Sequence, residues 1–453
     1  MTPLSLTRRA ALCLTMALAA CPGGAQASQA SPSFSGPMLG PVPVEFILFA
    51  GVLAGVALFH AFTLRIALGG VVLISLYKMV FSPFAFGPGL GGWALHLGHE
   101  WVVLSNLLLL LLGFALLAKH FEDSEVPAVL PRWLPDDWVG CFVLLALVFV
   151  LSAFLDNIAA AMIGGAVART VFRGRVHIGY LAAIVAASNG GGAGSVVGDT
   201  TTTMMWIAGV SPLEVLEAFI ASGVALVVFG VPMAMQQQAY SPIQKDASPD
   251  ARIDWPRVLV VVFILAAAVA VNVLINTRFN AVSDRFPFLG VAVWLAIVVS
   301  AVWRRPDWSQ LPGAFKGAVF LLSLVLSASM MPVAQLPLAS WQTAFGLGFL
   351  SAVFDNIPLT ALALKQGGYD WGFLAYAVGF GGSMIWFGSS AGVALASMYP
   401  EARSVGLWLR RGWAIPVAYV VGFFTLLVML GFHPGSTPRG SAAPVAVAAS
   451  APA

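Results

Sequence analysis

The stretch Leu151-Ser152-Ala153-Phe154-Leu155-Asp156-Asn157-Ile158 occurs a second time, 199 residues further along the chain, as Leu350-Ser351-Ala352-Val353-Phe354-Asp355-Asn356-Ile357. A second motif follows in both places. Gly191-Gly192, five residues and Gly198-Asp199-Thr200 match Gly381-Gly382, five residues and Gly388-Ser389-Ser390, at an offset of 190. Two motifs that recur in the same order indicate an internal repeat, so the chain consists of two related halves.

The composition predicts that both halves lie in a membrane. Of the 453 residues, 59% are hydrophobic and only 9% are charged, and the mean hydropathy is +0.91. A globular domain carries roughly 25% charged residues because its surface is solvated. These values exclude a soluble enzyme and a secreted disulfide scaffold, and a net charge of +3 gives no reason to expect a nucleic-acid partner. We therefore predict an all-α integral membrane protein in a lipid bilayer.

The two ends of the chain differ from the rest. Arg8 and Arg9 precede an apolar run too short to span a bilayer, and Ala25-Gln26-Ala27 is typical of a cleavage site, so residues 1–27 are predicted to be a signal-like segment. The alternative is that Cys21 is lipidated. Residues 434–453 are rich in Ala, Pro and Ser and are predicted to be a disordered tail. The three cysteines are too few and too scattered for a metal site or a disulfide framework, and no cofactor is expected.

Between these ends, apolar segments are long enough for helices that cross roughly 30 Å of hydrocarbon. We predict ten spans, near residues 44–62, 66–82, 101–118, 177–209, 213–235, 257–275, 288–303, 313–331, 371–398 and 412–433. Two further segments, 138–168 and 340–365, each carry an Asp-Asn pair in the middle. Because such a pair caps a new helix start, we predict that both segments are re-entrant hairpins with a polar tip.

The positions of the basic residues support this topology. Two of the 22 Lys and Arg lie in the signal-like segment; if residues 28–43 lie outside and only the ten spans cross, five fall outside and the other 15 inside. This distribution follows the positive-inside rule. If residues 138–168 crossed fully, Arg169, Arg173 and Arg175 would change sides and weaken it. We predict a multi-pass protein of a bacterial inner membrane, with both termini periplasmic.

The polar residues 236–256 are predicted to be a cytoplasmic linker between the halves, which span 28–235 and 257–433. Each half then has three spans, a hairpin, a broken helix (177–209 or 371–398) and a final span, and therefore five crossings. An odd number of crossings inverts the second half relative to the first. Inverted repeats whose discontinuous helices meet at the midplane are a recurrent design of secondary transporters.

The repeated motifs place polar groups at mid-membrane depth. An ionisable side chain there costs roughly 3 kcal/mol even on a lenient scale, so it is by default a functional hypothesis. The alternative is that each Asp-Asn pair merely caps the second hairpin arm. Carboxylates, amides and hydroxyls together form a hard-oxygen environment of the kind that hard cations prefer. The predicted ion- or substrate-binding residues are Asp156, Asn157, Asp199, Thr200, Thr201, Asp355, Asn356, Ser389 and Ser390.

Glycines cluster beside these polar residues. Each glycine inside a helix costs about 1 kcal/mol relative to alanine, so the runs at 188–192 and 379–382 are predicted to be unwound backbone with inward-facing carbonyls. The alternative, compatible with the first, is that the glycines permit close helix packing. The predicted backbone or hinge positions are Gly191, Gly192, Gly198, Gly381, Gly382 and Gly388.

The two halves differ in charge, because Asp199 in the first corresponds to Ser389 in the second. We therefore predict that Na⁺ binds at Asp156, Asn157 and Asp199. Two neighbouring carboxylates cannot both stay ionised without a cation, so one proton and one Na⁺ would compete for them. Such competition is what an antiporter requires at its centre.

At these motifs the chain resembles the ion transporter superfamily, and within it the NhaD-type sodium/proton antiporters, which are related to citrate, dicarboxylate and arsenite permeases. The likeness covers residues 138–433. Its specific motifs are Gly198-Asp199-Thr200-Thr201-Thr202 and Gly388-Ser389-Ser390-Ala391-Gly392, whereas the Asp-Asn pairs are shared more widely. The resemblance implies a scaffold domain that forms a homodimer. It also implies a transport domain of two hairpins and two broken helices that moves like an elevator.

Three functions are open at this point. The first, which we favour, is Na⁺/H⁺ or Li⁺/H⁺ antiport, with His99 beside Glu100 as a further candidate for proton handling. The second is Na⁺- or H⁺-coupled transport of citrate or another carboxylate, although no Lys or Arg lies in the four motifs to bind it. The third is an intramembrane aspartyl protease built on Asp156 and Asp199, a chemistry in which the second copy of the motif has no role. The favoured prediction is a transporter of a small ion and not an enzyme.

Overall fold

The computed structural model describes residues 36–59, 62–129, 134–244, 252–279, 285–438 and 441. Within these ranges the chain is helical apart from a two-stranded antiparallel ribbon, β1 (Met38–Leu39) with β2 (Val42–Pro43). The all-α fold class is therefore confirmed. The signal-like segment 1–27 lies outside the described residues, as do most of the predicted tail and the middle of the linker.

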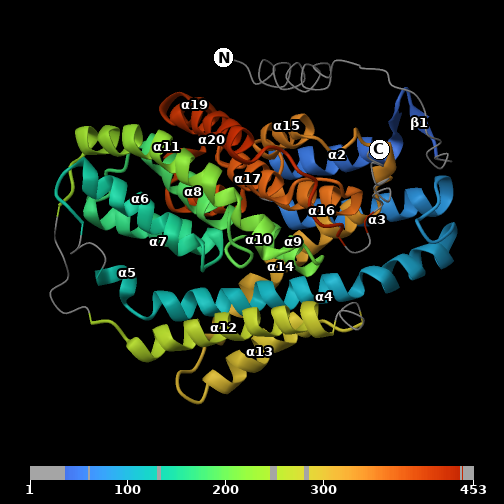
Figure 1. Cartoon of the computed structure of the whole chain (residues 1–453), viewed down its shortest axis with the longest axis horizontal. Coiled ribbons are helices and arrows are strands. Elements are labelled where there is room, and N and C mark those ends of the chain that lie inside the picture. The colour runs from blue at the N-terminus through green and yellow to red at the C-terminus, as the bar shows by residue number, and fades with distance from the viewer. Residues whose placement is uncertain are drawn as a thin grey trace, which may run out of the picture. The chain divides into compact units, whose positions relative to one another are not determined.

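One set of helices is arranged around a single long helix, which most of them contact directly. It comprises α2 (Val44–Leu58), α3 (Thr63–Phe81), α4 (Gly89–Glu122), α12 (Trp255–Arg278), α13 (Phe288–Ser300) and α14 (Leu311–Ser329). Helix α4 contacts α3, α12, α13 and α14, and Figure 1 shows it running alongside α12. At 34 residues α4 is about 51 Å long. It begins twelve residues before the span predicted at 101–118.

The second set contains both repeated motifs. From the first half it takes α6 (Trp138–Ser152), α7 (Asn157–Val171), α8 (Ile178–Ala193), α9 (Thr200–Ile207), α10 (Pro212–Leu216) and α11 (Ala218–Tyr240). From the second half it takes α15 (Trp341–Ser351), α16 (Asn356–Gln366), α17 (Trp371–Gly381), α18 (Ser390–Met398), α19 (Val405–Arg411) and α20 (Ala414–Leu430). Short connecting helices complete the described chain: α5 (Val126–Val129), η4 (Trp308–Gln310), η5 (Val333–Gln335) and η6 (Pro400–Arg403).

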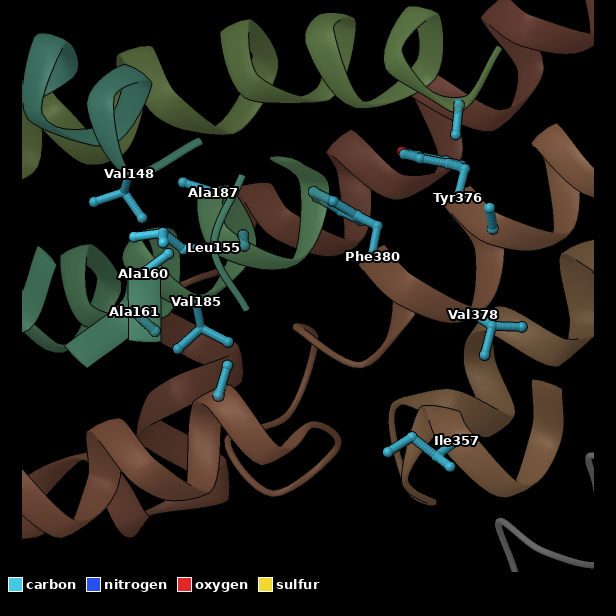
Figure 2. Close-up of a cluster of buried hydrophobic side chains, with 14 of the residues drawn as sticks. Val148, Leu155, Ala160, Ala161, Val185, Ala187, Ile357, Tyr376, Val378 and Phe380 are labelled. Atoms are coloured by element: carbon cyan, nitrogen blue, oxygen red, sulfur yellow. The ribbon is translucent and has the colours of Figure 1, made fainter. Parts of the chain in front are cut away.

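Helices α8 and α17 contact each other at the centre of this second set. Residues Gly179–Ala193 of α8 and all of α17 are buried. Their sequences are apolar on every side, which is typical of a helix surrounded by other helices. Figure 2 shows Val185 and Ala187 of α8 and Val378 and Phe380 of α17 in one buried cluster. Since lipid tails are as apolar as these side chains, close packing rather than exclusion of water stabilises this arrangement in a bilayer.

The chain breaks at four places in the second set, and each new helix begins with a capping side chain. Asp156 accepts a hydrogen bond from the Ile158 N–H at the start of α7, and Asp355 accepts one from the Ile357 N–H at the start of α16. Asp199 caps α9 and Ser389 caps α18. An N-cap of this kind is worth about 1 kcal/mol. The carboxylates therefore cap helices, and those of Asp199 and Asp355 also accept hydrogen bonds from other side chains.

Most of the glycine runs are helical, so the expectation that they are unwound is wrong for Gly191, Gly192 and Gly381. These three residues lie in the last turns of α8 and α17. A Cβ atom on Gly191 would collide with the carbonyl oxygen of Phe149. The glycines are tolerated there because they allow close backbone packing, which was the alternative interpretation. The unwound segments come directly afterwards, at residues 194–199 and 382–389.

Equivalent glycines meet equivalent neighbours in the two halves. A Cβ atom on Gly381 would collide with the carbonyl oxygen of Gly348, which corresponds to Phe149. A Cβ atom on Gly192 would lie 2.8 Å from the Gly198 oxygen, and one on Gly382 would lie 2.8 Å from the Gly388 oxygen. The sequence repeat is therefore also a repeat of local packing.

Helices of the first half pack on helices of the second half in equivalent pairs. Helix α7 of the first half packs on α18 of the second, and α16 of the second packs on α9 of the first. The final helices α11 and α20 pack on each other, as α8 and α17 do. This pattern is what two halves related by a two-fold axis would give. The inversion of the second half stays a prediction.

By length and composition, four helical segments of the described chain could each cross a membrane: Thr63–Phe81, Gly89–Glu122, Pro212–Tyr240 and Trp308–Ser329. A bent pair, Val405–Arg411 with Ala414–Leu430, would be a fifth. The other apolar helices are represented by stretches of 10–17 described residues, among them Trp138–Ser152 and Asn157–Val171. These two helices are separated by the polar tip at Asp156 and have 15 residues each, so each is only about 22 Å long. The ten-span topology therefore remains a prediction.

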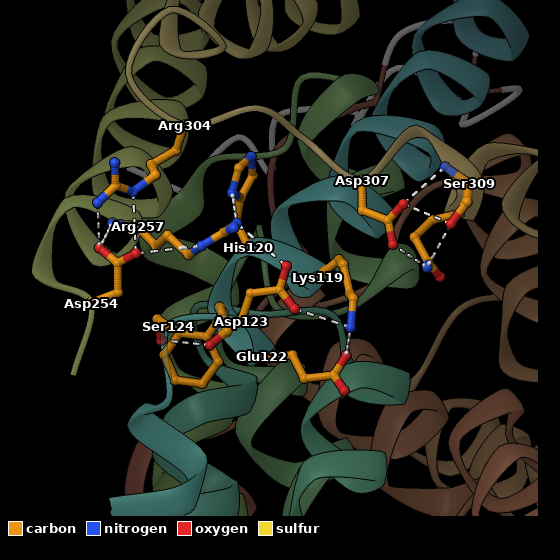
Figure 3. A network of polar contacts seen from close by, with 12 residues as sticks. Lys119, His120, Glu122, Asp123, Ser124, Asp254, Arg257, Arg304, Asp307 and Ser309 are labelled. Carbon is orange, nitrogen blue, oxygen red and sulfur yellow. Dashed lines mark hydrogen bonds and ion pairs between the residues drawn. The ribbon is translucent and has the colours of Figure 1, made fainter. Parts of the chain in front are cut away.

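An ion-pair network joins the C-terminal end of α4 to the region around the start of α12 (Figure 3). Lys119 Nζ lies 3.1 Å from Asp123 Oδ1, and Arg257 Nη1 lies 3.3 Å from Asp123 Oδ2. Arg304 contacts Asp254 through Nε at 3.2 Å, and its hydrogen bonds hold the pKa of Asp254 below the ordinary value. Lys119, Arg257 and Arg304 are among the 15 basic residues that the predicted topology places inside. Their proximity agrees with a common side of the membrane for all three.

Cysteine labelling tests the predicted topology. Arg175, between α7 and α8, is exposed and is assigned to the cytoplasmic side, whereas Leu213, which is 73% exposed, is assigned to the outside. With the native cysteines replaced by serine, we expect a membrane-impermeant maleimide to label Leu213→Cys in intact cells. Arg175→Cys should react only after permeabilisation. Labelling of Arg175→Cys from outside would refute the first hairpin.

Candidate functional site

The predicted binding residues all lie at the four chain breaks of the second set. Asp199 is only 2% exposed, and Asn157, Asn356 and Ser389 are also buried. Asp156 and Asp355 are half-buried. A buried carboxylate is costly unless its oxygens find partners, so the contacts of Asp199 indicate what the site stabilises.

Asp199 connects the two halves of the chain. Its Oδ1 accepts a hydrogen bond from the Thr201 N–H at 3.3 Å, which caps α9. Its Oδ2 accepts a hydrogen bond from Asn356 Nδ2, also at 3.3 Å. Asn356 belongs to the tip of the other half's α15–α16 segment, so one carboxylate links a broken helix of the first half to the polar tip of the second.

A second connection runs in the opposite direction. Asn157 Nδ2 donates to Asn189 Oδ1 at 3.1 Å. Asn189 Nδ2 in turn donates to Ser383 Oγ and to Ser389 Oγ, both at 3.0 Å. The tip of the first half is thereby tied to the broken helix of the second.

The remaining hydroxyls have different partners. Thr202 and Thr203 donate to backbone carbonyls in the break, including that of Asp199 at 2.9 Å, and so stabilise the unwound segment. Ser390 Oγ donates to Asp355 Oδ2 at 3.0 Å. The hydroxyl of Thr201 is buried and interacts with the carboxylate of Asp199. Its oxygen adds one more hard donor beside that carboxylate.

Two other carboxylates act electrostatically on Asp199, Asp156 more strongly than Asp355. Within the described ranges, no three His, Cys, Asp or Glu side chains are grouped closely enough to hold a metal ion by themselves. A cation at this site would therefore need oxygen atoms from amides, hydroxyls or the backbone as well.

The structure joins Asp199 to Asn356 and Asp355 to Ser390 by hydrogen bonds. The Na⁺ site predicted at Asp156, Asn157 and Asp199 stays a prediction. Two polar residues of the network were missed, Asn189 and Ser383. Both are buried, and the available signal was a polar side chain inside an otherwise apolar helix or at its end. His99, the other candidate, lies in α4 against Phe86, with ring centroids 5.0 Å apart.

A cavity of about 290 Å³ lies at the end of α17 that is remote from its break. Its acidic lining includes Glu214, Glu217 and Asp370, with His433. Asp370 caps α17, and its Oδ2 accepts a hydrogen bond from the His433 N–H at 2.9 Å. These side chains are held by the polypeptide itself, and the cavity is separate from the polar network at the breaks.

Comparison with known proteins places the chain in a family. A family profile described as citrate transporter matches residues 4–381. Sodium/proton antiporter 1 of Arabidopsis thaliana is 30% identical over 360 residues, 71% of this chain and 59% of that protein. Sodium/proton antiporter 2 of the same plant is 27% identical over 324 residues, 63% of this chain and 75% of that protein. The chain thus spans less than two thirds of the length of the first of these relatives.

Among solved structures, that of the Alcanivorax borkumensis YdaH transporter, described as having an unusual topology, is similar with a TM-score of 0.48. It is 14% identical and covers 84% of this chain and 99% of that chain. This likeness is too weak to carry an argument. The family profile extends over most of the chain, from before the first span to the end of α17. The protein therefore belongs to the citrate transporter family of multi-pass membrane transporters.

Proposed function

We propose that this protein is a Na⁺/H⁺ or Li⁺/H⁺ antiporter whose cation site is centred on Asp199. The observation that carries the proposal is a buried carboxylate at a helix break, beside the buried hydroxyl of Thr201. A buried carboxylate is stable when it binds either a proton or a cation. The site therefore exchanges one for the other.

Asp156 and Asn157 complete the proposed site. Asp156 supplies a second negative charge that acts on Asp199. Asn157 offers the oxygen of its amide, whose nitrogen donates to Asn189. Hard oxygen donors of this kind suit alkali cations better than soft metals. When the cation leaves, repulsion between the carboxylates favours uptake of a proton by one of them.

The two sets of helices support an elevator-type mechanism as part of the proposal. The four chain breaks and their polar network all lie in the second set, whereas the first set holds the long helix α4. Movement of the second set against the first would carry the intact site across the membrane. We further propose that the first set mediates homodimerisation, and that the protein lies in a bacterial inner membrane with periplasmic termini.

The relatives support antiport, since two proteins of 30% and 27% identity are described as sodium/proton antiporters. The second candidate is cation-coupled transport of citrate or another carboxylate, which the family description favours. Against it, the polar contacts at the breaks involve carboxylates, amides and hydroxyls, with no Lys or Arg in the hydrogen bonds described for Asp199 and Asn189. A tricarboxylate would need positive charge at that place.

Reconstitution separates the two candidates. In liposomes with an imposed pH gradient, we expect addition of Na⁺ or Li⁺ to dissipate the gradient, and citrate without either cation to have no effect. Protein-free liposomes are the control. Accumulation of labelled citrate under a Na⁺ gradient, with no cation-dependent proton movement, would replace antiport by carboxylate transport.

A further inference from the structure

The two polar connections between the halves are built differently. Asn356 reaches Asp199 directly, at 3.3 Å. The equivalent pair in the other direction is Asn157 and Ser389, and these two side chains meet only through Asn189. The repeat therefore has one direct contact and one bridged contact at equivalent positions.

The alignment of the two halves explains why only one of the two connections has a bridging residue. With the offset of 190, Asn189 aligns with Gly379 and Asp199 aligns with Ser389. A Cβ atom on Gly379 would lie 3.6 Å from Asp199 Oδ2 and 3.2 Å from the Ala193 Cβ. The carboxylate of Asp199 thus lies beside the space that the missing side chain leaves. On the other side a short serine is accompanied by a long asparagine.

Asn189 uses both hydrogens of its amide nitrogen, and its amide oxygen, in the bridge. Its amide nitrogen has two hydrogens, which go to Ser383 and Ser389, and its oxygen accepts from Asn157. A buried polar network in which the members are satisfied is rigid and specific. With its oxygen bonded to Asn157 and its nitrogen to two serines, the Asn189 amide is held in place and does not turn toward an ion.

We propose that Asn189 is a positioning residue that takes the place of a second carboxylate, so that the half-site at Ser389 is a closed copy of the cation site at Asp199 that lacks the buried carboxylate. This inference rests on the proposed function and narrows it, because each chain then has one cation site at its broken helices and not two. The pair of residues, and not either one alone, determines which half-site binds the cation. Asp199 beside Gly379 leaves its half-site open, whereas Ser389 bonded to Asn189 closes the other half-site.

Exchange of the pair tests the proposal. Asn189→Gly alone should lower the midpoint of thermal unfolding of the purified protein by several degrees, because the side chains of Asn157, Ser383 and Ser389 lose their partner. Ser389→Asp alone should also lower it, because Asn189 fills the space that the carboxylate requires. The double variant N189G/S389D recreates the Asp199–Gly379 arrangement, so its midpoint should lie well above the value expected from adding the two single effects.

A carboxylate one residue further along provides the matched control. Ser390 already donates to Asp355, so N189G/S390D should show no recovery. Additive effects in N189G/S389D, or an unchanged midpoint in Asn189→Gly, would overturn the proposal. These measurements are made without added cation, so they decide the role of Asn189 even if the wild-type protein fails to exchange Na⁺ for protons.

A separate measurement, the stabilisation of the folded protein as a function of Na⁺ concentration, gives the number of cation sites. Stabilisation of the folded protein by Na⁺ should follow a single-site curve in the wild type, with a Hill coefficient of about one. In N189G/S389D the curve should steepen or acquire a second phase. Recovery of the midpoint with an unchanged Na⁺ curve would overturn the claim of a second cation site. Absence of any Na⁺ effect in the wild type would instead count against the proposed antiport.

Discussion

Replacement of Asp199 by asparagine is expected to reduce cation-driven proton movement to the level of protein-free liposomes. Asparagine has nearly the same size and caps helices about as well as aspartate, so it can still accept the hydrogen bond from the Thr201 N–H. It cannot take up or release a proton and carries no charge for a cation. The change therefore removes the chemistry and preserves the start of α9.

The same substitution at Asp137 is the control for this prediction. Asp137 is the exposed N-cap of α6 and accepts a hydrogen bond from the Val139 N–H at 3.0 Å. Asp137→Asn makes the same chemical change far from the breaks and should leave the exchange rate close to that of the wild type. Normal exchange in Asp199→Asn, measured at matched protein density in the liposomes, would refute the proposed site.

Addition of one methyl group at Gly191 is expected to destabilise the second set of helices strongly. The new Cβ atom would collide with the carbonyl oxygen of Phe149, which belongs to the backbone of α6 and cannot rotate away. Overpacking of this kind typically costs about 1–3 kcal/mol. We expect Gly191→Ala to give a lower yield of folded protein and a lower unfolding midpoint in detergent. Gly381→Ala should behave similarly, since it meets the carbonyl oxygen of Gly348.

Gly223 provides a matched comparison within α11. A Cβ atom there would meet nothing within 4 Å. Gly223→Ala should therefore leave the protein as stable as the wild type or stabilise it, because alanine favours a helix by about 1 kcal/mol over glycine. If Gly191→Ala and Gly223→Ala unfolded at the same temperature, the close approach of α6 and α8 would not be a determinant of the fold.

The repeat in the sequence was sufficient to locate the four chain breaks. A polar pair such as Asp156-Asn157 inside an apolar segment has a local physical consequence, because it caps a helix, and local consequences can be predicted from local sequence. The glycine runs were misjudged because propensity argued for unwinding, whereas their packing against Phe149 and Gly348 depends on segments that are distant along the chain. Tertiary packing outweighed a cost of about 1 kcal/mol per glycine.

The polar network was the part that sequence could not supply. Asn356 and Asp199 are separated by 157 residues, and no periodicity relates them. The offset of the repeat was enough to align Asn189 with Gly379. The structural role of Asn189 could not be predicted, because it depends on the contact between Asn189 and Ser389 across the two halves. Likewise, the extension of α4 back to Gly89 crosses His96, whose Nε2 lies 2.9 Å from Ser329 Oγ of a helix far away in sequence.

The interleaving of the halves has a consequence for biogenesis. Helix α7 packs on α18, and the Tyr399 hydroxyl at the end of α18 donates to the Gly165 carbonyl of α7 at 2.8 Å, across 234 residues. During synthesis, α7 is therefore complete long before its partner leaves the ribosome. The first half must wait in the bilayer with Asn189 and Asp199 still lacking the side chains of the second half that will satisfy them. Assembly of this protein is thus a single event that takes place only when the last third of the chain has been inserted.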